Sequence, residues 1–236
     1  MKGLRQAVFT QHNNVIGNLN LLFAIKACCP DTHLIKLGTM GEYGTPNIDI
    51  EEGWIDIESR GRKGRFLFPR QAGSLYHTTK IMDTDLIWFG VRTWGLRVTD
   101  LMQGPVYGIE TKESKINKKL MTIFNYDEIF GTVINRFIVQ AVAGYPLTVY
   151  GKGGQSRGYL SLEDSLQCTY VSFENKAKPG ELRIYNQIME TFSVNELADL
   201  TKDAASELGY DVTINHINNP REELEEHYYN PIYKKL

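Results

Sequence analysis

Residues 33–47 read HLIKLGTMGEYGTPN, and the change of character within this stretch decides the fold. The apolar run His33–Leu37 has the length of a β-strand, and Gly38 ends it. Thr39 comes next, at the carboxyl end of the expected strand, where parallel α/β sheets bind their ligands. Its hydroxyl is therefore a candidate for contact with a substrate, although a turn-capping role explains an isolated threonine equally well.

The rest of the chain alternates expected helices with expected strands, which is typical of βαβ units and a mostly parallel sheet. Gly95 stands where the longest expected helix needs a C-cap, and Ser193 and Glu196 have the spacing of a capping box. We expect helices at residues 13–27, 75–94, 128–143, 162–171 and 193–208, strands at 33–37, 96–102, 147–150, 182–185 and 211–217, and a hairpin at 54–57 and 65–68.

Size, charge and cysteine content are those of an ordinary globular protein. The chain has 236 residues, of which 42% are hydrophobic, and a net charge of -2, so no electrostatic argument favours nucleic acid as a partner. No apolar run approaches the ~20 residues of a membrane span, and the first residues lack the apolar core of a secretory signal. Cys28, Cys29 and Cys168 have no metal-ligand spacing and are expected to be reduced packing thiols.

The strongest local motif is Tyr76-x-x-x-Lys80, in the sequence YHTTK. Residues four apart on a helix lie on one face, so the phenol and the ammonium point the same way. A neighbouring cation lowers the pKa of a phenol, which makes Tyr76 a candidate general base for a sugar or alcohol hydroxyl. The spacing also arises by chance on solvated helices, and the motif gains weight from the hydroxyl of Thr39.

Other polar residues stand at a helix start, a strand end or in loops. Asn13 and Asn14 precede an expected helix, where capping is the simpler role. Gln103 follows an expected strand, and Arg157 and Arg221 lie in loops, where a guanidinium suits a phosphate group. The histidines show no metal spacing, so we expect no metal ion, and no G-x-S-x-G elbow marks a serine nucleophile.

Several segments, taken in order, carry a resemblance. NNVIGNLNLLFAIK, KLGTMGEYGTPN, YHTTK and QGPVYG resemble the extended short-chain dehydrogenase/reductase family of NAD-dependent epimerases/dehydratases. GYPLTVYGKGGQSRGYL and NPREELEEHYYN are similar to the branch that uses UDP-glucose and sulfite in sulfolipid biosynthesis, formally placed among the hydrolases. The resemblance runs from Arg5 to Leu236. It implies an α/β fold: a Rossmann-like parallel sheet with a smaller C-terminal α/β region that binds the UDP-sugar.

The resemblance also implies a redox cycle on the sugar. This branch uses bound NAD to oxidise the 4-hydroxyl to a ketone, loses water across C5 and C6, adds sulfite and returns the hydride. Tyr76 would be the base at the 4-hydroxyl, Lys80 would lower its pKa and hold the nicotinamide ribose, and Thr39 would bind the 4-oxygen. Further implied contacts to the cofactor or the UDP-sugar fall on Asn13, Gln103, Asn135, Arg136, Gln155, Arg157 and Arg221.

The residues after Thr39 differ from those found at the same place in a related group within this family. Sugar 4,6-dehydratases place an aspartate and then a glutamate directly after this threonine, to expel the C6 hydroxyl and take the C5 proton. Met40 and Gly41 stand there in this chain, and neither can transfer a proton. An apolar, open place also suits an incoming anion better than a carboxylate would. We therefore expect His77 to handle the protons at C5 and C6, with Glu42 as a second candidate.

The family's glycine-rich NAD turn has no counterpart in the chain, and the resemblance would place it roughly a hundred residues upstream. We expect residues 1–108 to be the remaining part of the NAD-binding domain and residues 109–236 to be mainly the UDP-sugar-binding region. The chain is then the catalytic half of the sulfite-using enzyme, a non-catalytic fragment with an exposed sheet edge, or part of another epimerase or dehydratase. The family also implies a homodimer, in the cytoplasm or, in a photosynthetic eukaryote, in the chloroplast stroma.

Overall fold

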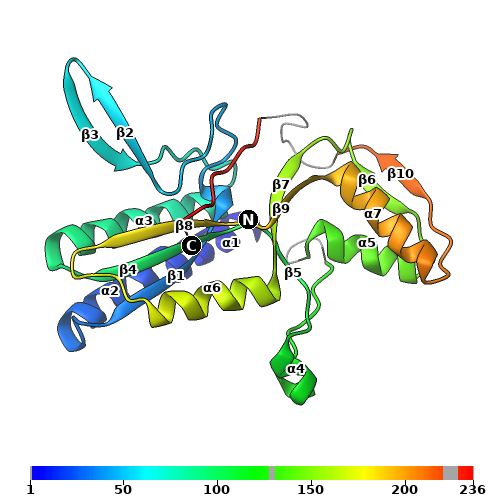
Figure 1. The fold of residues 1–236 in the computed structure, drawn as a ribbon, viewed down its shortest axis with the longest axis horizontal. Coiled ribbons are helices and arrows are strands. Elements are labelled where there is room, and N and C mark those ends of the chain that lie inside the picture. Colours follow the sequence, from blue (N-terminus) through cyan, green and yellow to red (C-terminus); the bar gives the residue numbers. More distant parts are fainter. Residues whose placement is uncertain (1, 128–130, 220–227, 236) are drawn as a thin grey trace. The chain divides into compact units, whose positions relative to one another are not determined.

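Helices and strands alternate along the chain in an α/β fold, as expected (Figure 1). This computed structural model describes residues 2–127, 131–219 and 228–235. The helical segments are α1 (Lys2–Gln11), η1 (His12–Ile16), α2 (Gly17–Cys28), η2 (Met40–Glu42), α3 (Leu75–Trp94), α4 (Lys112–Ile116), η3 (Lys118–Leu120), α5 (Val133–Val142), α6 (Leu162–Glu174) and α7 (Val194–Glu207). The strands are β1 (His33–Thr39), β2 (Trp54–Ser59), β3 (Arg62–Leu67), β4 (Arg97–Gln103), β5 (Val106–Tyr107), β6 (Leu147–Tyr150), β7 (Ser156–Ser161), β8 (Leu182–Gln187), β9 (Glu190–Ser193) and β10 (Ile214–Ile217).

The helix caps expected from the sequence are confirmed. Gly95 caps α3 in the left-handed conformation, with φ of 71°, and Ser193 and Glu196 form the capping box of α7. The β2–β3 hairpin turns through Arg60 and Gly61, which both have positive φ as its tight turn requires. The short elements α4, β5, β7 and β9 were not anticipated, because segments of two to six residues carry too little periodicity to be recognised.

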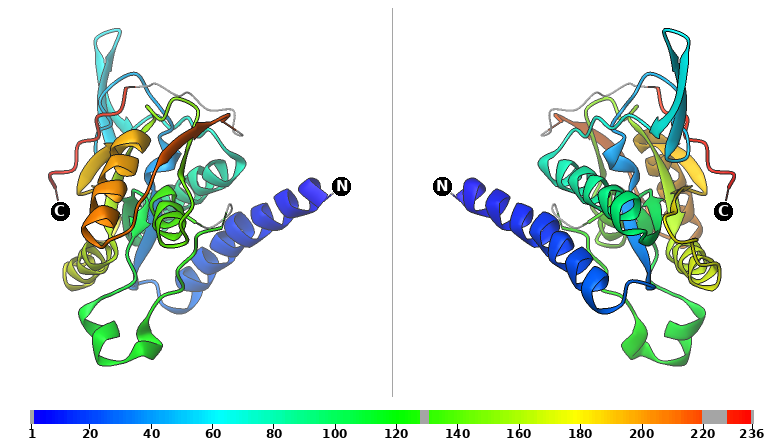
Figure 2. Two further views of the ribbon diagram at one scale, coloured as in Figure 1. Left: turned by 90° about the vertical axis from the view of Figure 1, so that its right-hand side faces the viewer. Right: turned by 90° about the vertical axis from the view of Figure 1, so that its left-hand side faces the viewer.

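The first helix begins earlier than expected, so the N-cap assignment of Asn13 and Asn14 is wrong. α1, the π-helical turn η1 and α2 form one continuous rod (Figure 2). Both asparagines lie inside η1, and such π-turns are frequent at functional sites. Asn14 Nδ2 donates a hydrogen bond to Thr79 Oγ1 of α3 at 3.0 Å. This hydrogen bond therefore connects the rod to α3, the helix that carries Tyr76.

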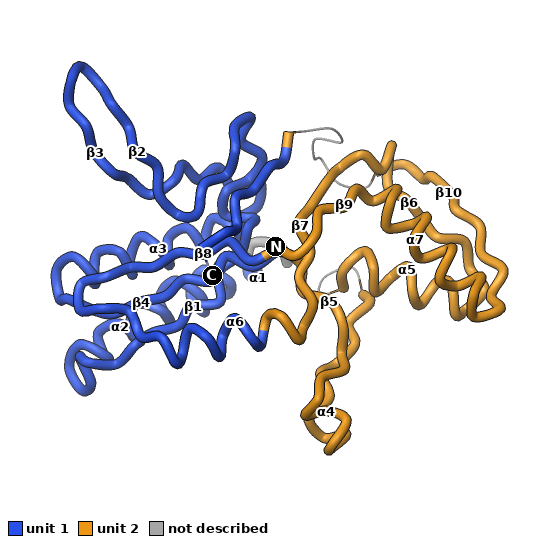
Figure 3. The backbone as a smooth tube through the Cα atoms, viewed as in Figure 1, with its two compact units in different colours: residues 1–104, 166–187, 229–236 blue, residues 105–165, 188–228 orange. Residues whose placement is uncertain are grey.

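The chain divides into two compact units, each described by itself (Figure 3). Unit 1 comprises residues 1–104, 166–187 and 229–236, and unit 2 comprises residues 105–165 and 188–228. Unit 1 contains the expected catalytic residues on β1, η2 and α3, and unit 2 contains most of the expected UDP-sugar contacts. The functional division expected at residue 108 concerns binding roles and stays a prediction.

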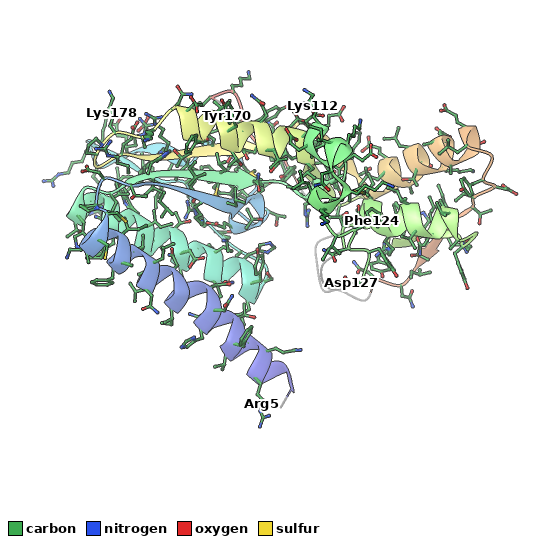
Figure 4. All side chains as sticks on the ribbon, turned by 90° about the horizontal axis from the view of Figure 1, so that it is seen from below. Arg5, Lys112, Phe124, Asp127, Tyr170 and Lys178 are labelled. Carbon is green, nitrogen blue, oxygen red and sulfur yellow. The ribbon has the colours of Figure 1, made fainter. Side chains whose placement is uncertain are left out.

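Unit 1 is built on a parallel three-stranded sheet with the order β1-β4-β8. Figure 4 shows α6, marked by Tyr170, on one side of this sheet, with α3 and the rod on the other. Leu22 of α2, Ile87 of α3, Val98 of β4 and Ile184 of β8 belong to the buried core of the unit. Within the described residues β1 and β8 are the outer strands of this sheet.

Unit 2 combines parallel and antiparallel strand pairs. β6 pairs with β10 in parallel, whereas β7 pairs with β9 in antiparallel orientation, so the sheet structure is only partly parallel. The apolar core of the unit includes Phe137 of α5, Leu147 and Val149 of β6, and Leu197 and Ala198 of α7. Burial of these side chains between helices and strands is the main source of stability for such a layer.

Two expectations drawn from composition can be compared with the structure. Cys28, Cys29 and Cys168 are free thiols, but Cys28 and Cys29 are exposed, so the expected packing role is wrong for these two. They lie where α2 ends, and a helix terminus leaves side chains open to water. In the part of the chain that the structure describes, no helix has the length and apolar character needed to cross a bilayer.

A buried ionic cluster ties together the elements of unit 1. Lys36 Nζ of β1 contacts Glu42 Oε1 of η2 at 2.8 Å, Thr84 Oγ1 of α3 at 2.6 Å and Asp100 Oδ2 of β4 at 3.0 Å. Three acceptors match the three protons of an ammonium group. Arg70 Nη1 lies 3.3 Å from Glu42 Oε2, so two cations face two carboxylates. One lysine side chain thereby holds two strands, the turn and the helix at fixed positions.

The cluster depends on its charges being paired. Burial alone would lower the pKa of Lys36, but the carboxylates of Asp100 and Glu42 raise that pKa above its usual value. Burial raises the pKa of Glu42, although the ammonium of Lys36 acts in the opposite direction. Gly38 leaves room for the cluster, because a Cβ there would overlap Asp100 Oδ1 and lie 2.9 Å from Met102 Sδ. The glycine at the end of HLIKLG is therefore a packing requirement.

Replacing Lys36 by Met should destabilise the protein by about 3–5 kcal/mol, because two buried carboxylates lose the cation that they share. Without it, the folded-state pKa of Glu42, already raised by burial, rises further above its unfolded value. A carboxyl group of this kind is destabilising when ionised, so the free energy of unfolding of the variant should increase as the pH falls through that raised pKa. Urea denaturation of the protein at pH 7 and at about pH 5 measures both effects.

Lys63→Met is the matched control. Lys63 Nζ lies 3.5 Å from Glu58 Oε2, but its side chain is 81% exposed, so its loss should change stability by less than about 0.5 kcal/mol. An equally small loss for Lys36→Met, or a loss that does not shrink in acid, would contradict the role given to the cluster.

Candidate functional site

The candidate site of unit 1 lies at the carboxyl ends of its parallel strands. Thr39 ends β1, Gln103 ends β4 and Gln187 ends β8, and the three are register partners across the sheet. Gln103 Nε2 donates a hydrogen bond to Gln187 Oε1 at 3.1 Å. Ligands of α/β sheets bind beyond this edge, so polar groups from all three strands lie in the expected place.

Sequence reasoning missed Gln187. Its side chain is buried, and its Nε2 has no hydrogen-bond partner among the described residues. A buried amide donor without a partner indicates a position for an acceptor from a ligand or water. The expected strand at 182–185 stops two residues short, and the polar pair Asn186–Gln187 at its end was the signal that could have identified this residue.

Thr39 caps the turn that follows β1, and its contact with a substrate stays a prediction. Its Oγ1 accepts a hydrogen bond from Gly41 N at 3.2 Å and so caps η2. A hydroxyl retains a second lone pair and its own proton after accepting one bond, so capping leaves the group able to bind a substrate oxygen. The cap fixes this hydroxyl at the end of β1.

α3 places the Y-x-x-x-K motif beside this strand end. Ser74 is the N-cap of the helix, and its Oγ accepts a hydrogen bond from His77 N at 3.2 Å. The motif therefore occupies the first turns, with Tyr76 and Lys80 one turn apart on one face as expected. The phenol of Tyr76 is half exposed, and its ring centroid lies 5.1 Å from that of His77.

The electrostatic effect of Lys80 on the pKa of Tyr76 stays a prediction. Lys80 Nζ lies 3.8 Å from Asp83 Oδ2, further along α3, and neutralises that carboxylate. Partial burial raises the pKa of Tyr76, the negative charge of Glu42 raises it further, and Lys36 acts in the opposite direction. The environment of Tyr76 therefore disfavours the phenolate, and a positive charge placed close to the phenol would act in the opposite direction.

His77 lies directly against Gly41. A Cβ added to Gly41 would overlap the imidazole at Nε2 and Cδ2 and lie 2.6 Å from Cε1. On the other side of the ring, Ser74 Oγ lies 2.9 Å from His77 Nδ1. The imidazole thus occupies the space that any side chain at position 41 would need.

Glu42 is fully buried in the ionic cluster. Its Oε1 binds Lys36, and its Oε2 accepts a hydrogen bond from Thr84 Oγ1 at 3.1 Å and faces Arg70. Both oxygens are thereby engaged inside unit 1. The proton-transfer role expected of Glu42 stays a prediction, and the geometry shows it as a structural support of η2.

Two of the expected UDP-sugar residues have internal partners in unit 2. Arg136 Nη2 donates a hydrogen bond to the carbonyl oxygen of Thr148 at 2.8 Å, and its guanidinium stacks 4.1 Å from the ring centroid of Tyr150. Asn135 Nδ2 donates to the carbonyl oxygen of Asn125 at 2.8 Å. These contacts order the side chains on and around α5.

The other expected UDP-sugar residues of unit 2 lie near β7. Gln155 is buried, and its Oε1 has no hydrogen-bond partner among the described residues. Arg157 Nη1 donates to the carbonyl oxygen of Ser156 at 2.8 Å. Arg221 lies outside the described residues. Asn13, which belongs to unit 1, lies in η1 with Nδ2 3.5 Å from Asn14 Oδ1.

Two curated relatives match the chain over nearly its whole length. It is 53% identical over 231 residues to the chloroplastic UDP-sulfoquinovose synthase of Spinacia oleracea, covering 98% of this chain and 48% of the relative. It is 48% identical over 237 residues to the UDP-sulfoquinovose synthase of Sulfolobus acidocaldarius, covering 100% of this chain and 60% of the relative. The chain therefore spans about half the length of the curated relatives it matches. Neither name supports the hydrolase class expected above.

A solved structure and a family model agree on the fold. The UDP-glucose 4-epimerase of Thermotoga maritima with UDP-glucose matches with a TM-score of 0.72 at 20% identity, covering 98% of this chain and 64% of that one. The model of the NAD dependent epimerase/dehydratase family matches residues 3–186, which include the site of unit 1. The chain belongs to the NAD dependent epimerase/dehydratase family.

Proposed function

We propose that the protein containing this chain is a UDP-sulfoquinovose synthase, which converts UDP-glucose and sulfite to UDP-sulfoquinovose and water. The identity of 53% and 48% to two relatives of that name supports the proposal. The observation that carries it is the imidazole of His77 lying in the space of a side chain at position 41. In this proposal His77 is the proton carrier at a place where Met40 and Gly41 of the loop cannot transfer a proton.

NAD is the proposed cofactor, and the residues of unit 1 fit it. Tyr76 and Lys80 share a face of α3, and Gln103 and the unpartnered amide of Gln187 lie at the strand ends beside them. In this proposal Lys80 would leave Asp83 and bind the nicotinamide ribose, and Gln103 would contact the cofactor. When bound, NAD would supply the acceptor and later the donor of the hydride at C4 of the sugar.

The protein's residues handle the protons of this reaction. Tyr76 accepts the proton of the 4-hydroxyl as C4 is oxidised, and Thr39 binds the same oxygen through its hydroxyl. The resulting ketone acidifies the C5–H bond. The C5 proton passes to His77, the C6 hydroxyl leaves as water, and sulfite adds at C6 while C5 regains a proton. Tyr76 finally returns its proton to O4, so UDP-glucose and bisulfite balance against UDP-sulfoquinovose and water.

UDP recognition belongs to unit 2 in this proposal. Asn135, Arg136, Gln155 and Arg157 would contact the substrate, with the guanidinium groups suited to the diphosphate. Arg136 is held by Thr148 and Tyr150, so its orientation is set before a ligand binds. We also propose a homodimer. A chloroplast location is proposed only if the source is a photosynthetic eukaryote, as for the spinach relative.

The protein supplied with NAD, UDP-glucose and sulfite should form UDP-sulfoquinovose, and His77→Ala should lower its formation by at least about 100-fold, because general acid–base catalysis contributes about 10²–10⁴-fold. Oxidation at C4 does not need His77, so the variant should still build up reduced NAD with UDP-glucose alone. Mass spectrometry of the sugar nucleotide and absorbance of the reduced cofactor measure the two steps.

His33→Ala is the control, because this histidine begins β1 at the end opposite Thr39. It should leave product formation within about twofold of the starting protein. Formation of only a 4-keto-6-deoxy or epimerised sugar would assign the protein to another epimerase or dehydratase. Undiminished turnover of His77→Ala would remove His77 from the mechanism.

Gly41→Ala tests the place of the imidazole. The added Cβ would overlap the ring of His77 and displace it, so product formation should fall by about 10–100-fold while C4 oxidation persists. Gly17→Ala is the control, since a Cβ at this helical position meets nothing within 4 Å. Equal rates for the two variants would show that the position of His77 against Gly41 has no bearing on turnover.

A further inference from the structure

The same oxygen of Ser74 contacts His77 twice. Ser74 Oγ lies 2.9 Å from Nδ1 of the imidazole and accepts the backbone N–H of His77 at 3.2 Å. Ser74 has an extended backbone, with φ of -142° and ψ of 157°, which directs its side chain toward the first turn of α3. The orientation of the ring is thereby linked to the helix terminus itself.

The movement of the His77 ring is also restricted on the side opposite Ser74. Nε2, Cδ2 and Cε1 of His77 are the nearest atoms to where a Cβ of Gly41 would stand, so the imidazole rests on the backbone of η2. η2 is in turn fixed by Glu42 in the ionic cluster. Nδ1 therefore faces Ser74, and Nε2 faces the turn that follows Thr39.

We propose that Ser74 is a positioning residue for His77, whose hydroxyl oxygen accepts the Nδ1–H of the imidazole and so leaves Nε2 as the atom that exchanges protons with the sugar. This inference rests on the proposed function and deepens it. It assigns one nitrogen of His77 to the chemistry and names the group that selects that nitrogen.

The hydrogen bonds are compatible with this assignment. A serine hydroxyl has two acceptor lone pairs, and the N–H of His77 and the Nδ1–H of its ring use both. The hydroxyl proton of Ser74 then points to solvent, because this residue is exposed. In a neutral imidazole with its proton on Nδ1, the lone pair lies on Nε2, which is then the proton acceptor.

One nitrogen can then perform two transfers. Nε2 takes the proton from C5 as the electron pair of that C–H bond forms the C5–C6 double bond and the C6–O bond breaks. The imidazolium returns the proton from Nε2 to the departing C6 oxygen, which leaves as water, so protons and electrons balance without another reactant. Nδ1–H stays on Ser74 throughout, and the tautomer is unchanged at the end.

A purely structural role for Ser74 would be a capping box, with Ser74 at the N-cap and His77 three residues later. Two variants separate this role from positioning. Ser74→Gly removes the hydroxyl but retains a residue that is well accepted at an N-cap, so α3 should keep its first turn. Ser74→Thr retains the hydroxyl and should restore the contact.

The experiment uses the whole protein with NAD bound, labelled with 15N in its histidines and assigned with His77→Ala. Long-range 1H–15N correlation spectra report which ring nitrogen of His77 carries the proton. The starting protein and Ser74→Thr should hold the proton mainly on Nδ1, whereas Ser74→Gly should show a mixture of tautomers. For Ser74→Gly we expect kcat about tenfold lower or more, with KM for UDP-glucose unchanged, and recovery of kcat in Ser74→Thr.

A proton mainly on Nε2 in the starting protein, or a tautomer unaffected by Ser74→Gly, would overturn the inference. Unchanged kcat in Ser74→Gly would do the same, and so would a Ser74→Thr variant as slow as Ser74→Gly. The spectra do not depend on turnover. If the protein fails to make UDP-sulfoquinovose, the proposed function is wrong while the tautomer still decides whether Ser74 orients His77.

Discussion

The contact of one buried ammonium with three acceptors is the constraint on which the site depends. Lys36 Nζ binds Glu42, Thr84 and Asp100, which belong to η2, α3 and β4. Taking these charges out of water is costly, and a well-packed apolar cluster could give similar stability. An apolar cluster would not fix relative positions in the same way, because hydrogen bonds are directional and dispersion contacts are not. The cluster therefore sets the position of η2 relative to α3, on which the contact between Gly41 and His77 depends.

Local rules predicted those parts of the fold that local interactions determine. The caps at Gly95 and Ser193 follow from backbone conformation and from one side chain meeting one backbone amide, so the sequence spacing is sufficient. Thr39 and the Y-x-x-x-K motif were found for a similar reason, since strand ends and helix faces can be read from periodicity. The start of the first helix was missed, because Asn13 has the residue type of an N-cap but lies inside the π-turn of a continuous helical rod.

The parts of the site that escaped prediction depend on residues distant in sequence. Lys36 appears in the sequence as a polar interruption of a strand, and only the approach of Asp100, 64 residues later, makes it the centre of a cluster. Gln187 was overlooked because its partner, Gln103, lies 84 residues away. Periodicity carries no information about such pairings.

Two glycines in HLIKLGTMGEYGTPN matter for the side chains that they allow nearby. Gly38 admits the carboxylate of Asp100, and Gly41 admits the imidazole of His77. In the proposed reaction this exchange has an electrostatic consequence. A carboxylate on the loop would repel sulfite and the sulfonate that forms from it, whereas a neutral imidazole does not. Moving the proton carrier from the loop to α3 thus removes a negative charge from the place where an anion must arrive and keeps a group able to accept and donate a proton there.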